Sequence, residues 1–323
     1  MTNRFNARRA RHGLAAAAML ASIATSAADY PARPVRFIVP SAAGGTQDIV
    51  TRLVAQKMSE SLGQSIIVEN RVGGDTLIGT RFVKDAPADG YTVLAQANGF
   101  TILPELNMSP GYDPLRDFTG VGMMTRSPYL MVVGADQPDR TARDFVARAK
   151  SQPLTFASGG LGGPPHVAAT LFMKSQGVAL TNVLYKGNGV SYADVVAGRV
   201  STMFGGYNGI LPYLQSGKMR ALAVTSPKRI APLPDVPTFV EQGIDYRYTL
   251  WLGLLVRADT PKDIVARLSQ SLRQALDSKE LRDRFAGEGA DASFLTPTEF
   301  NQFLTDEVKA MKTLALELNL PKQ

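Results

Sequence analysis

The chain has 323 residues, of which 45% are hydrophobic and 20% are charged, so it has an ordinary globular composition and the length for two compact lobes. It contains no cysteine, which excludes disulfide bonds and thiolate metal sites. The formal net charge is +7, but four arginines and no acidic residue lie in the first 28 residues. The remaining 31 basic and 28 acidic residues leave +3, a balance too mild to indicate a nucleic-acid partner.

The first 28 residues have the pattern of a secretory signal peptide. Four arginines precede an apolar segment at residues 13–23, and small residues follow at 25–28. The apolar segment is too short to cross a bilayer as a helix, and no later run reaches about 18 apolar residues. We therefore expect export, cleavage after Ala27 or Ala28, and a mature chain that begins near Asp29.

Strands and helices alternate along the next part of the chain. Short apolar runs rich in β-branched residues predict strands, and apolar residues that recur at helical spacing predict helices. The predicted strands lie at 35–39, 65–69 and 92–96, and the predicted helices at 46–62 and 78–85. This alternation is typical of a parallel sheet covered by helices.

The loop between the first strand and the first helix consists of small residues, among them Gly44 and Gly45. It leaves the first N–H groups of the helix unpaired at the positive end of the helix dipole, where no bulky side chain blocks an anion. A glycine-rich turn can also exist for purely steric reasons, so the loop alone is compatible with an anion site or a structural turn. It is not a Walker A loop, because no Gly-Lys-Ser/Thr sequence follows it.

The middle of the chain predicts a crossing into a second lobe. Residues 97–101 and 104–117 are expected to form loops, the latter because it is rich in Pro, Gly, Asp and Asn. Apolar segments at 121–124 and 129–133 predict one long crossing strand, and residues 251–256 predict the return, with Trp251 in the core or at the hinge.

The predicted second lobe contains the same arrangement as residues 35–62, in which a strand is followed by a glycine-rich turn and a helix. A predicted strand at 154–157 runs into the turn 158–163, and a helix begins at about Pro165. We expect this helix N-terminus and that of the helix at 46–62 to face each other across a cleft and to grip an anion. The remaining predicted strands lie at 182–185, 201–204 and 220–225, and the remaining helices at 141–150, 192–197, 262–276 and 297–318.

A series of short motifs runs through nearly the whole mature chain. The motifs are Ile38-Val39-Pro40, Gly44-Gly45-Thr46-Gln47-Asp48, Leu62-Gly63-Gln64, Val68-Glu69-Asn70-Arg71, Gly73-Gly74, Ile78-Gly79, Asp89-Gly90-Tyr91-Thr92, Tyr185-Lys186-Gly187, residues 217–225 and residues 233–238. In this order they resemble the substrate-binding receptors of tripartite tricarboxylate transporters, the Bug or TctC-type family. The glycine-rich turn at 158–166 matches the corresponding family loop at Ser158, Gly160, Gly162 and His166 and departs from it slightly at Gly163-Pro164.

The resemblance implies a ligand site built from loops of both lobes. The candidate ligand-binding residues are Ser41, Ala43, Gly44, Gly45, Thr46, Asp48, Asn98, Phe100, Thr101, Ser158, Gly160, Gly162, His166, Lys186, Gly206 and Tyr207. Plainer explanations stay open: Asp48 supports the helix dipole, and Lys186 is an ordinary exposed lysine. Phe100 and Tyr207 would likewise be explained by ordinary packing in the core. We expect no metal site, since the mature chain has a single histidine and no cysteine. We also expect no catalytic residue and no cofactor.

Ser158 and His166 flank one loop and suggest a different kind of function, a secreted serine-type hydrolase. A serine nucleophile needs a base that a third group orients, and no acid stands out as that third member. The G-x-S-x-G sequence is also missing. The two hydroxyls at Ser41 and Ser158 are credible as hydrogen-bond donors to a ligand rather than as nucleophiles.

The resemblance implies a type II periplasmic-binding-protein-like α/β fold, with two lobes joined by two crossover strands and the ligand between them. We expect a signal peptide at 1–28, a first lobe at 29–122 plus 252–323, and a second lobe at 123–251. The implied function is a Gram-negative periplasmic receptor that captures a small carboxylate for the membrane subunits of a transporter. The family accepts dicarboxylates, tricarboxylates, acidic amino acids and aromatic carboxylates. We expect a monomer that is not an enzyme.

Overall fold

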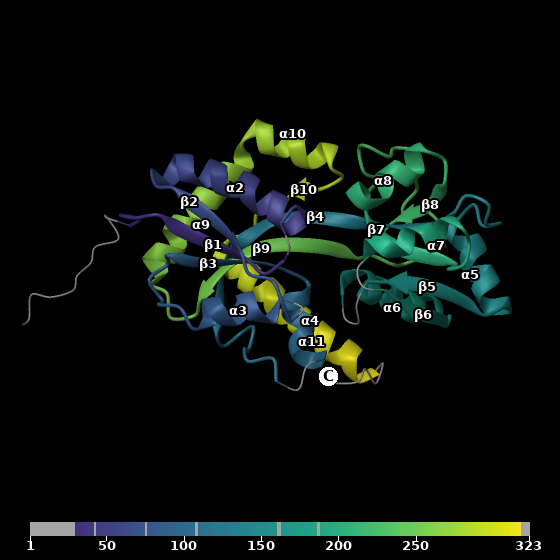
Figure 1. Ribbon diagram of the computed structural model, residues 1–323, viewed down its shortest axis with the longest axis horizontal. Helices are drawn as coiled ribbons and strands as arrows, with labels where there is room; N and C mark the ends of the chain where they lie inside the picture. Colours follow the sequence, from purple (N-terminus) through teal and green to yellow (C-terminus); the bar gives the residue numbers. More distant parts are fainter. Residues whose placement is uncertain are drawn as a thin grey trace, which may run out of the picture.

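The computed structural model describes residues 30–41, 43–74, 76–106, 109–159, 163–185 and 188–317. The predicted signal peptide at 1–28 lies outside these residues. Two α/β lobes lie side by side along the long axis of the molecule, and two long strands run between them (Figure 1). The expected two-lobed α/β architecture is confirmed.

The first lobe contains a parallel sheet flanked by helices, as the alternating sequence pattern predicts. Its strands are β1 (Val35–Val39), β2 (Ile66–Asn70) and β3 (Thr92–Ala97), with β1 between the other two. The connecting helices are α2 (Thr46–Leu62) and α3 (Leu77–Lys84), and α9 (Lys262–Asp277) packs beside α2. All of these elements begin and end within two residues of their predicted bounds, because their apolar spacing is a local signal.

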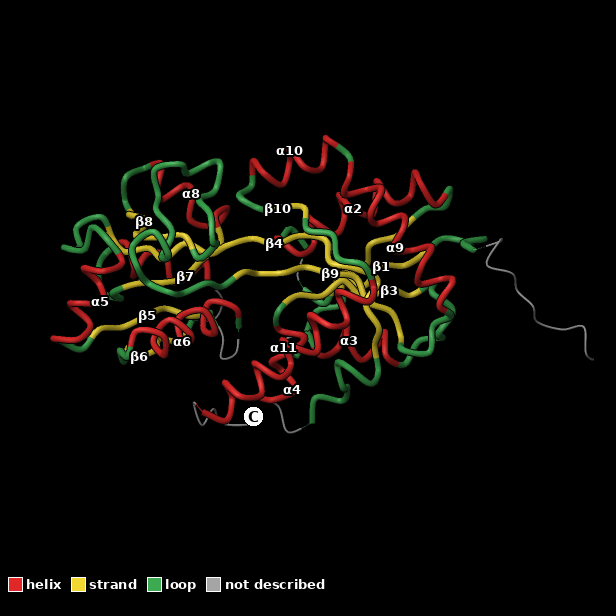
Figure 2. The backbone as a smooth tube through the Cα atoms, turned by 180° about the vertical axis from the view of Figure 1, so that it is seen from behind, coloured by secondary structure: helices red, strands yellow, loops and turns green. Residues whose placement is uncertain are grey.

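Two antiparallel strands connect the lobes. They are β4 (Phe118–Gly134) and β9 (Thr249–Arg257), which pair from Phe118 opposite Arg257 to Pro128 opposite Thr249. Beyond Pro128, β4 continues into the second lobe and pairs there with β7 (Thr202–Gly206) and β8 (Met219–Val224). Figure 2 shows β4 and β9 side by side between the lobes. The two predicted crossover strands are confirmed, and the predicted lobe boundaries fall inside them.

The second lobe places a parallel pair of strands next to β7. The strands are β5 (Leu154–Ser158) and β6 (Leu180–Leu184). The surrounding helices are α5 (Ala142–Ser151), α6 (Pro164–Gln176), α7 (Tyr192–Val196) and α8 (Tyr207–Gln215). Thr141 and Asp144 form a capping box at the start of α5, which confirms the predicted cap.

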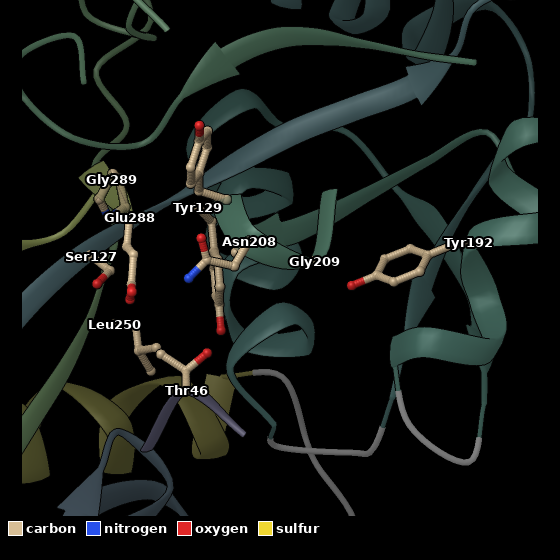
Figure 3. Close-up of a pocket in the computed structure, with 12 residues that line it drawn as sticks. Thr46, Ser127, Tyr129, Tyr192, Asn208, Gly209, Leu250, Glu288 and Gly289 are labelled. Carbon is tan, nitrogen blue, oxygen red and sulfur yellow. The ribbon is translucent and has the colours of Figure 1, made fainter. Parts of the chain in front are cut away.

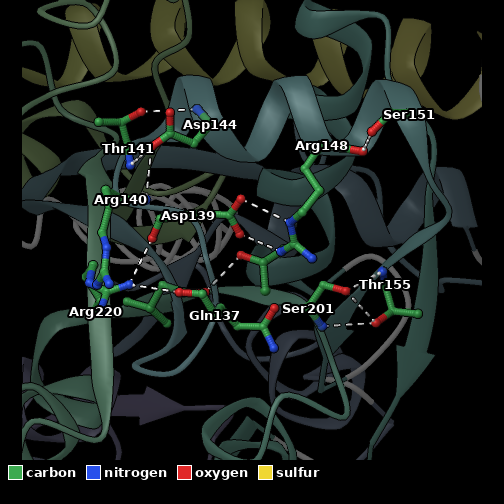
Figure 4. Close-up of polar contacts among 12 residues, drawn as sticks. Gln137, Asp139, Arg140, Thr141, Asp144, Arg148, Ser151, Thr155, Ser201 and Arg220 are labelled. Carbon is green, nitrogen blue, oxygen red and sulfur yellow. Dashed lines mark hydrogen bonds and ion pairs between the residues drawn. The ribbon is translucent and has the colours of Figure 1, made fainter.

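A buried ion pair and an arginine fix the turn that leads from β4 into α5 (Figure 4). Asp139 is 2% exposed and accepts a hydrogen bond of 3.0 Å from Nε of Arg148. The guanidinium of Arg220 donates to three backbone carbonyls, those of Ala135, Gln137 and Asp139. Arg148 and Arg220, which lie far apart in the sequence, therefore stabilise this turn of the second lobe.

Three helices were not predicted. Residues 99–101 belong to α4 (Gly99–Leu106), although both 97–101 and 104–117 were expected to be loops. Pro104 lies inside α4 and cannot donate to the carbonyl of Phe100; the hydroxyl of Tyr112 donates to that carbonyl instead, at 2.9 Å. The other two are α8, which contains Pro212, and the short charged helix α10 (Lys279–Gly287).

The end of the chain ties the two lobes together. β10 (Asp291–Ala292) pairs with β4, and α11 (Pro297–Glu317) follows. Trp251 of β9 is fully buried and its ring meets those of Phe300 and Phe303 of α11, as expected for a core position. Further along α11, Met311 belongs to the buried apolar cluster that contains Phe172 of α6. The lobes therefore share apolar packing on the side of α11.

Candidate ligand-binding site between the lobes

A cavity of about 190 Å³ opens between the lobes. Its wall combines the first lobe, the second lobe and the two crossover strands (Figure 3). The lining residues are Thr46, Ser127, Pro128, Tyr129, Tyr192, Gly206, Tyr207, Asn208, Gly209, Leu250, Glu288 and Gly289. Three of the predicted residues, Thr46, Gly206 and Tyr207, therefore lie at one cavity.

Two helices begin at this cavity, one from each lobe. Thr46 is the first residue of α2, whose N-cap is Gly45, and Tyr207 is the first residue of α8, whose N-cap is Gly206. Both glycines are in extended conformation and neither helix has a side-chain cap. Uncapped N–H groups at the positive ends of two helix dipoles favour an anion in the space between them. The N-terminus of α8 therefore lies at the cavity together with that of α2; we expected the N-terminus of α6 opposite α2, and residues 160–162 of the turn before α6 lie outside the described residues.

Asp48 shapes the loop in front of α2. Its carboxylate is 3% exposed and accepts hydrogen bonds of 2.9 Å from three groups: Gly44 N, Arg52 Nε and Asn70 Nδ2. The same amide of Asn70 donates to the carbonyl of Ser41, at 3.0 Å. Asp48 therefore positions the loop in front of α2 through contacts within the chain, which is the structural explanation left open by the sequence.

The loop itself offers accessible backbone. Ala43, Gly44, Gly45 and Thr46 are exposed. Gly44 has φ of +80°, a left-handed conformation that favours glycine. The hydroxyl of Ser41 is buried and has no hydrogen-bond partner among the described residues. The loop therefore presents small residues, and its backbone conformation is maintained by Asp48.

The carboxylate of Asp48 gives a prediction for pH dependence. Burial raises its pKa, but the hydrogen bonds from Arg52, Gly44 and Asn70 and the charge of Arg52 outweigh burial, so the pKa is lowered from 3.8. Because the folded protein binds this proton more weakly than the unfolded chain, the stabilisation is present above about pH 3.8 and decreases as the pH falls through the folded-state pKa.

Asp48→Ala should lower the free energy of unfolding at pH 7 by about 1–3 kcal/mol, because Gly44, Arg52 and Asn70 lose their acceptor. The deficit should become smaller toward pH 3. Urea unfolding of wild type and variant at both pH values measures it. Asp245→Asn is the control, since the Asp245 side chain is 86% exposed. A deficit that is equal at both pH values would contradict the assigned role.

The predicted residues after β3 are buried in the interior, and Asn98 contacts the crossover strand β9. The side chain of Asn98 accepts a hydrogen bond from Trp251 N at 2.9 Å and donates to the Thr249 carbonyl at 3.2 Å. Phe100 is fully buried and stacks on Tyr112 in the core. The hydroxyl of Thr101 lies 3.1 Å from Oε2 of Glu307. None of the three is among the lining residues described above: the side chain of Asn98 is bonded to β9, and Phe100 and Thr101 of α4 lie toward the core and α11.

Ser158 and His166 do not form an activated pair. Ser158 is 1% exposed and its hydroxyl donates to Oδ1 of Asn182, at 2.8 Å. His166 lies in the first turn of α6, and burial lowers its pKa below 6.5, so the imidazole is neutral at pH 7. Since the single hydroxyl proton of Ser158 is directed at Asn182, the geometry differs from that of a serine nucleophile beside its base. The predicted residues Gly160, Gly162 and Lys186 lie outside the described residues.

Several lining residues were not predicted. Ser127, Tyr129 and Leu250 belong to the crossover strands, and Tyr129 lies in a segment whose apolar pattern predicted a crossing strand and no ligand contact. Tyr192 is the first residue of α7, and Asn208 is the second residue of α8. Glu288 follows the unpredicted helix α10. Asn208 lies two residues after the Gly205-Gly206 pair, which was an available signal, whereas no local sequence pattern pointed to Glu288.

Comparisons with known proteins agree with this architecture. The family model described as "Tripartite tricarboxylate transporter family receptor" matches residues 50–320. Protein BugT of Bordetella pertussis is 32% identical over 289 residues, which cover 88% of this chain and 89% of BugT. The structure of R. palustris Rpa4515 with adipate is 32% identical, with a TM-score of 0.78, and the match covers 89% of this chain and 97% of that one. MatC of Rhodopseudomonas palustris with bound malate is 29% identical, with a TM-score of 0.75 and coverage of 88% and 99%.

Proposed function

The chain belongs to the tripartite tricarboxylate transporter receptor family, and we propose that it is a periplasmic receptor that binds a small carboxylate in the cavity between its lobes. The observation that carries this proposal is the meeting of two uncapped helix N-termini, those of α2 and α8, at one cavity. Two similar structures hold adipate and malate, both small carboxylates.

The carboxylate would be recognised mainly by neutral groups. No lysine or arginine is among the described lining residues of the cavity. A carboxylate there meets backbone N–H groups of α2 and α8, together with the hydroxyls of Thr46 and the lining tyrosines. The positive ends of two helix dipoles would take the role that an arginine side chain with two hydrogen bonds has in other carboxylate sites. Backbone groups and hydroxyls would then dominate the recognition of the ligand.

The receptor would act in the periplasm and deliver its ligand to the integral membrane subunits of a tripartite transporter. Residues 1–28 would direct export and then be removed. None of the described helices has the length and apolar character needed to cross a bilayer. We propose that the mature protein is a monomer and that it performs no chemistry on its ligand. The hydrolase alternative has no support in the geometry of Ser158 and His166.

A thermal-shift screen of carboxylates on the purified mature protein tests the proposal. A ligand present at about 100 times its dissociation constant adds about 2.7 kcal/mol to the stability of the folded state. We expect at least one small carboxylate to raise the melting temperature by about 5 °C, while the corresponding alcohol leaves it unchanged. If no carboxylate raises the melting temperature and the protein hydrolyses simple esters, the receptor function is wrong.

A further inference from the structure

Glu288 places a negative charge at the wall of the cavity. It directly follows α10, and Figure 3 shows its side chain extending toward the same space as those of Asn208 and Thr46. Among the described lining residues, Glu288 is the one that carries a formal charge at neutral pH. A carboxylate in the wall is unexpected for a receptor of anions, and it therefore bears on which anions the cavity accepts.

The charge of Glu288 is only partly compensated. Its Oε1 accepts a hydrogen bond of 2.7 Å from Nε of Arg284, one helical turn earlier. Oε2 accepts no hydrogen bond from any described residue. The Arg284 side chain is 61% exposed and that of Glu288 is 20% exposed, so the guanidinium lies toward solvent and the carboxylate toward the cavity. Arg284 itself is not among the lining residues.

The cavity therefore has two electrostatic poles. The N-termini of α2 and α8 favour a negative group, and Glu288 favours a cation or a hydrogen-bond donor. A second carboxylate of the ligand near Glu288 would meet a like charge in a partly desolvated place, which is unfavourable. A protonated amine at that position would meet an acceptor with a free lone pair.

We propose that Glu288 is a specificity-determining residue, which makes the receptor prefer carboxylates that carry a protonated amine over di- and tricarboxylates. The preference rests on the proposed function, since it presumes that a carboxylate occupies the helix N-termini. The ligand class is then that of amino acids with one carboxylate, in which the amine lies toward α10.

Calorimetric titration with matched ligands tests the preference. Each unbranched dicarboxylate of four to six carbons is compared with the amino acid in which an ammonium replaces the second carboxylate, for example glutarate with 4-aminobutanoate; α-amino acids of similar size are included. For wild type we expect the best amino acid to bind at least tenfold tighter than any dicarboxylate. Glu288→Gln should reduce this ratio at least tenfold.

Asp283→Asn is the matched control, because it removes a carboxylate from the same helix at a side chain that is 63% exposed and paired with Lys279. It should leave the ratio unchanged. If dicarboxylates bind wild type as tightly as amino acids, or if Glu288→Gln leaves the ratio unchanged, the role of Glu288 is wrong while the receptor function stands. If wild type binds no carboxylate of any class, the proposed function fails and the inference fails with it.

Discussion

Gly289→Val is expected to lower ligand affinity by about 100-fold, which corresponds to about 2.7 kcal/mol. Gly289 follows α10 in the first lobe and has φ of +70°, a conformation in which valine is strained. A Cβ atom there would lie 3.2 Å from Cβ and Cγ of Tyr207 and 3.3 Å from Cδ1 of Ile230. Both residues belong to the second lobe, so the valine side chain would act as a wedge that keeps the lobes apart.

Titration calorimetry with a carboxylate that binds wild type measures the loss, and small-angle scattering measures the lobe separation. The wild type should become more compact when the ligand binds, as expected for hinge closure, and the variant should not. Gly177→Val is the matched control: Gly177 has φ of +61°, but nothing lies within 4 Å of its Cβ position. It should lose stability and keep its affinity. Normal affinity and compaction in Gly289→Val would contradict the cross-lobe contact.

Glu307→Ala should lower the free energy of unfolding at pH 7 by about 2–3 kcal/mol, since it leaves a buried donor without an acceptor. Oε2 of Glu307 on α11 accepts a hydrogen bond of 2.8 Å from Nε1 of Trp251, a fully buried residue of β9. The hydroxyl of Thr101 lies 3.1 Å from the same oxygen. The carboxylate thus joins α11 to a crossover strand and to α4.

The Glu307→Gln variant distinguishes the effect of the hydrogen bond to Trp251 on stability from the effect of the buried charge. Burial raises the pKa of Glu307 above 4.5, against the opposing effects of Trp251, Thr101 and Arg126. Because the folded-state pKa is raised, the part of the stability that comes from protonation of Glu307 is full below about pH 4.5 and is lost as the pH rises through the folded-state value, while the hydrogen bond to Trp251 remains. The glutamine variant keeps an acceptor for Trp251 and avoids the buried charge, so at pH 7 it should be about as stable as wild type.

Urea unfolding at pH 7 and pH 4.5 distinguishes these variants. Relative to Glu307→Gln, wild type should gain stability on acidification. Asp306→Asn, at an exposed position on the same helix, is the control and should change little. A Glu307→Ala variant as stable as wild type would show that the contact between α11 and Trp251 does not stabilise the fold.

Much of the fold could be predicted because its signals are local. The bounds of α2 follow from apolar residues at helical spacing and from Gly63, which ends the helix in a left-handed conformation. The long strand β4 follows from two apolar segments close together in the sequence. By contrast, the segment that begins at Pro104 predicted a loop, although Pro104 lies inside α4, and the stabilising contact for α4, from Tyr112 to the Phe100 carbonyl, is visible only in three dimensions.

The candidate site was predictable only in part, since it is assembled from distant segments. The glycine-rich start of α2 marks one wall by its composition, and the sequence predicted it. The role of Asp48 depends on Asn70, which lies 22 residues later. The placement of Asn98 and Phe100 in the interior depends on a helix that was not expected, and the cavity wall at Glu288 depends on α10 facing α8 across the cleft. Such contacts are set by tertiary packing and leave no local pattern.

The central claim is that a small carboxylate binds between the N-termini of α2 and α8. A crystal structure of the mature protein with the tightest-binding carboxylate from the thermal-shift screen tests it most directly. We expect the carboxylate oxygens within about 3 Å of backbone N–H groups near Thr46 and Asn208. A carboxylate held by a lysine or arginine side chain, or one bound outside the cavity between the lobes, would contradict the account.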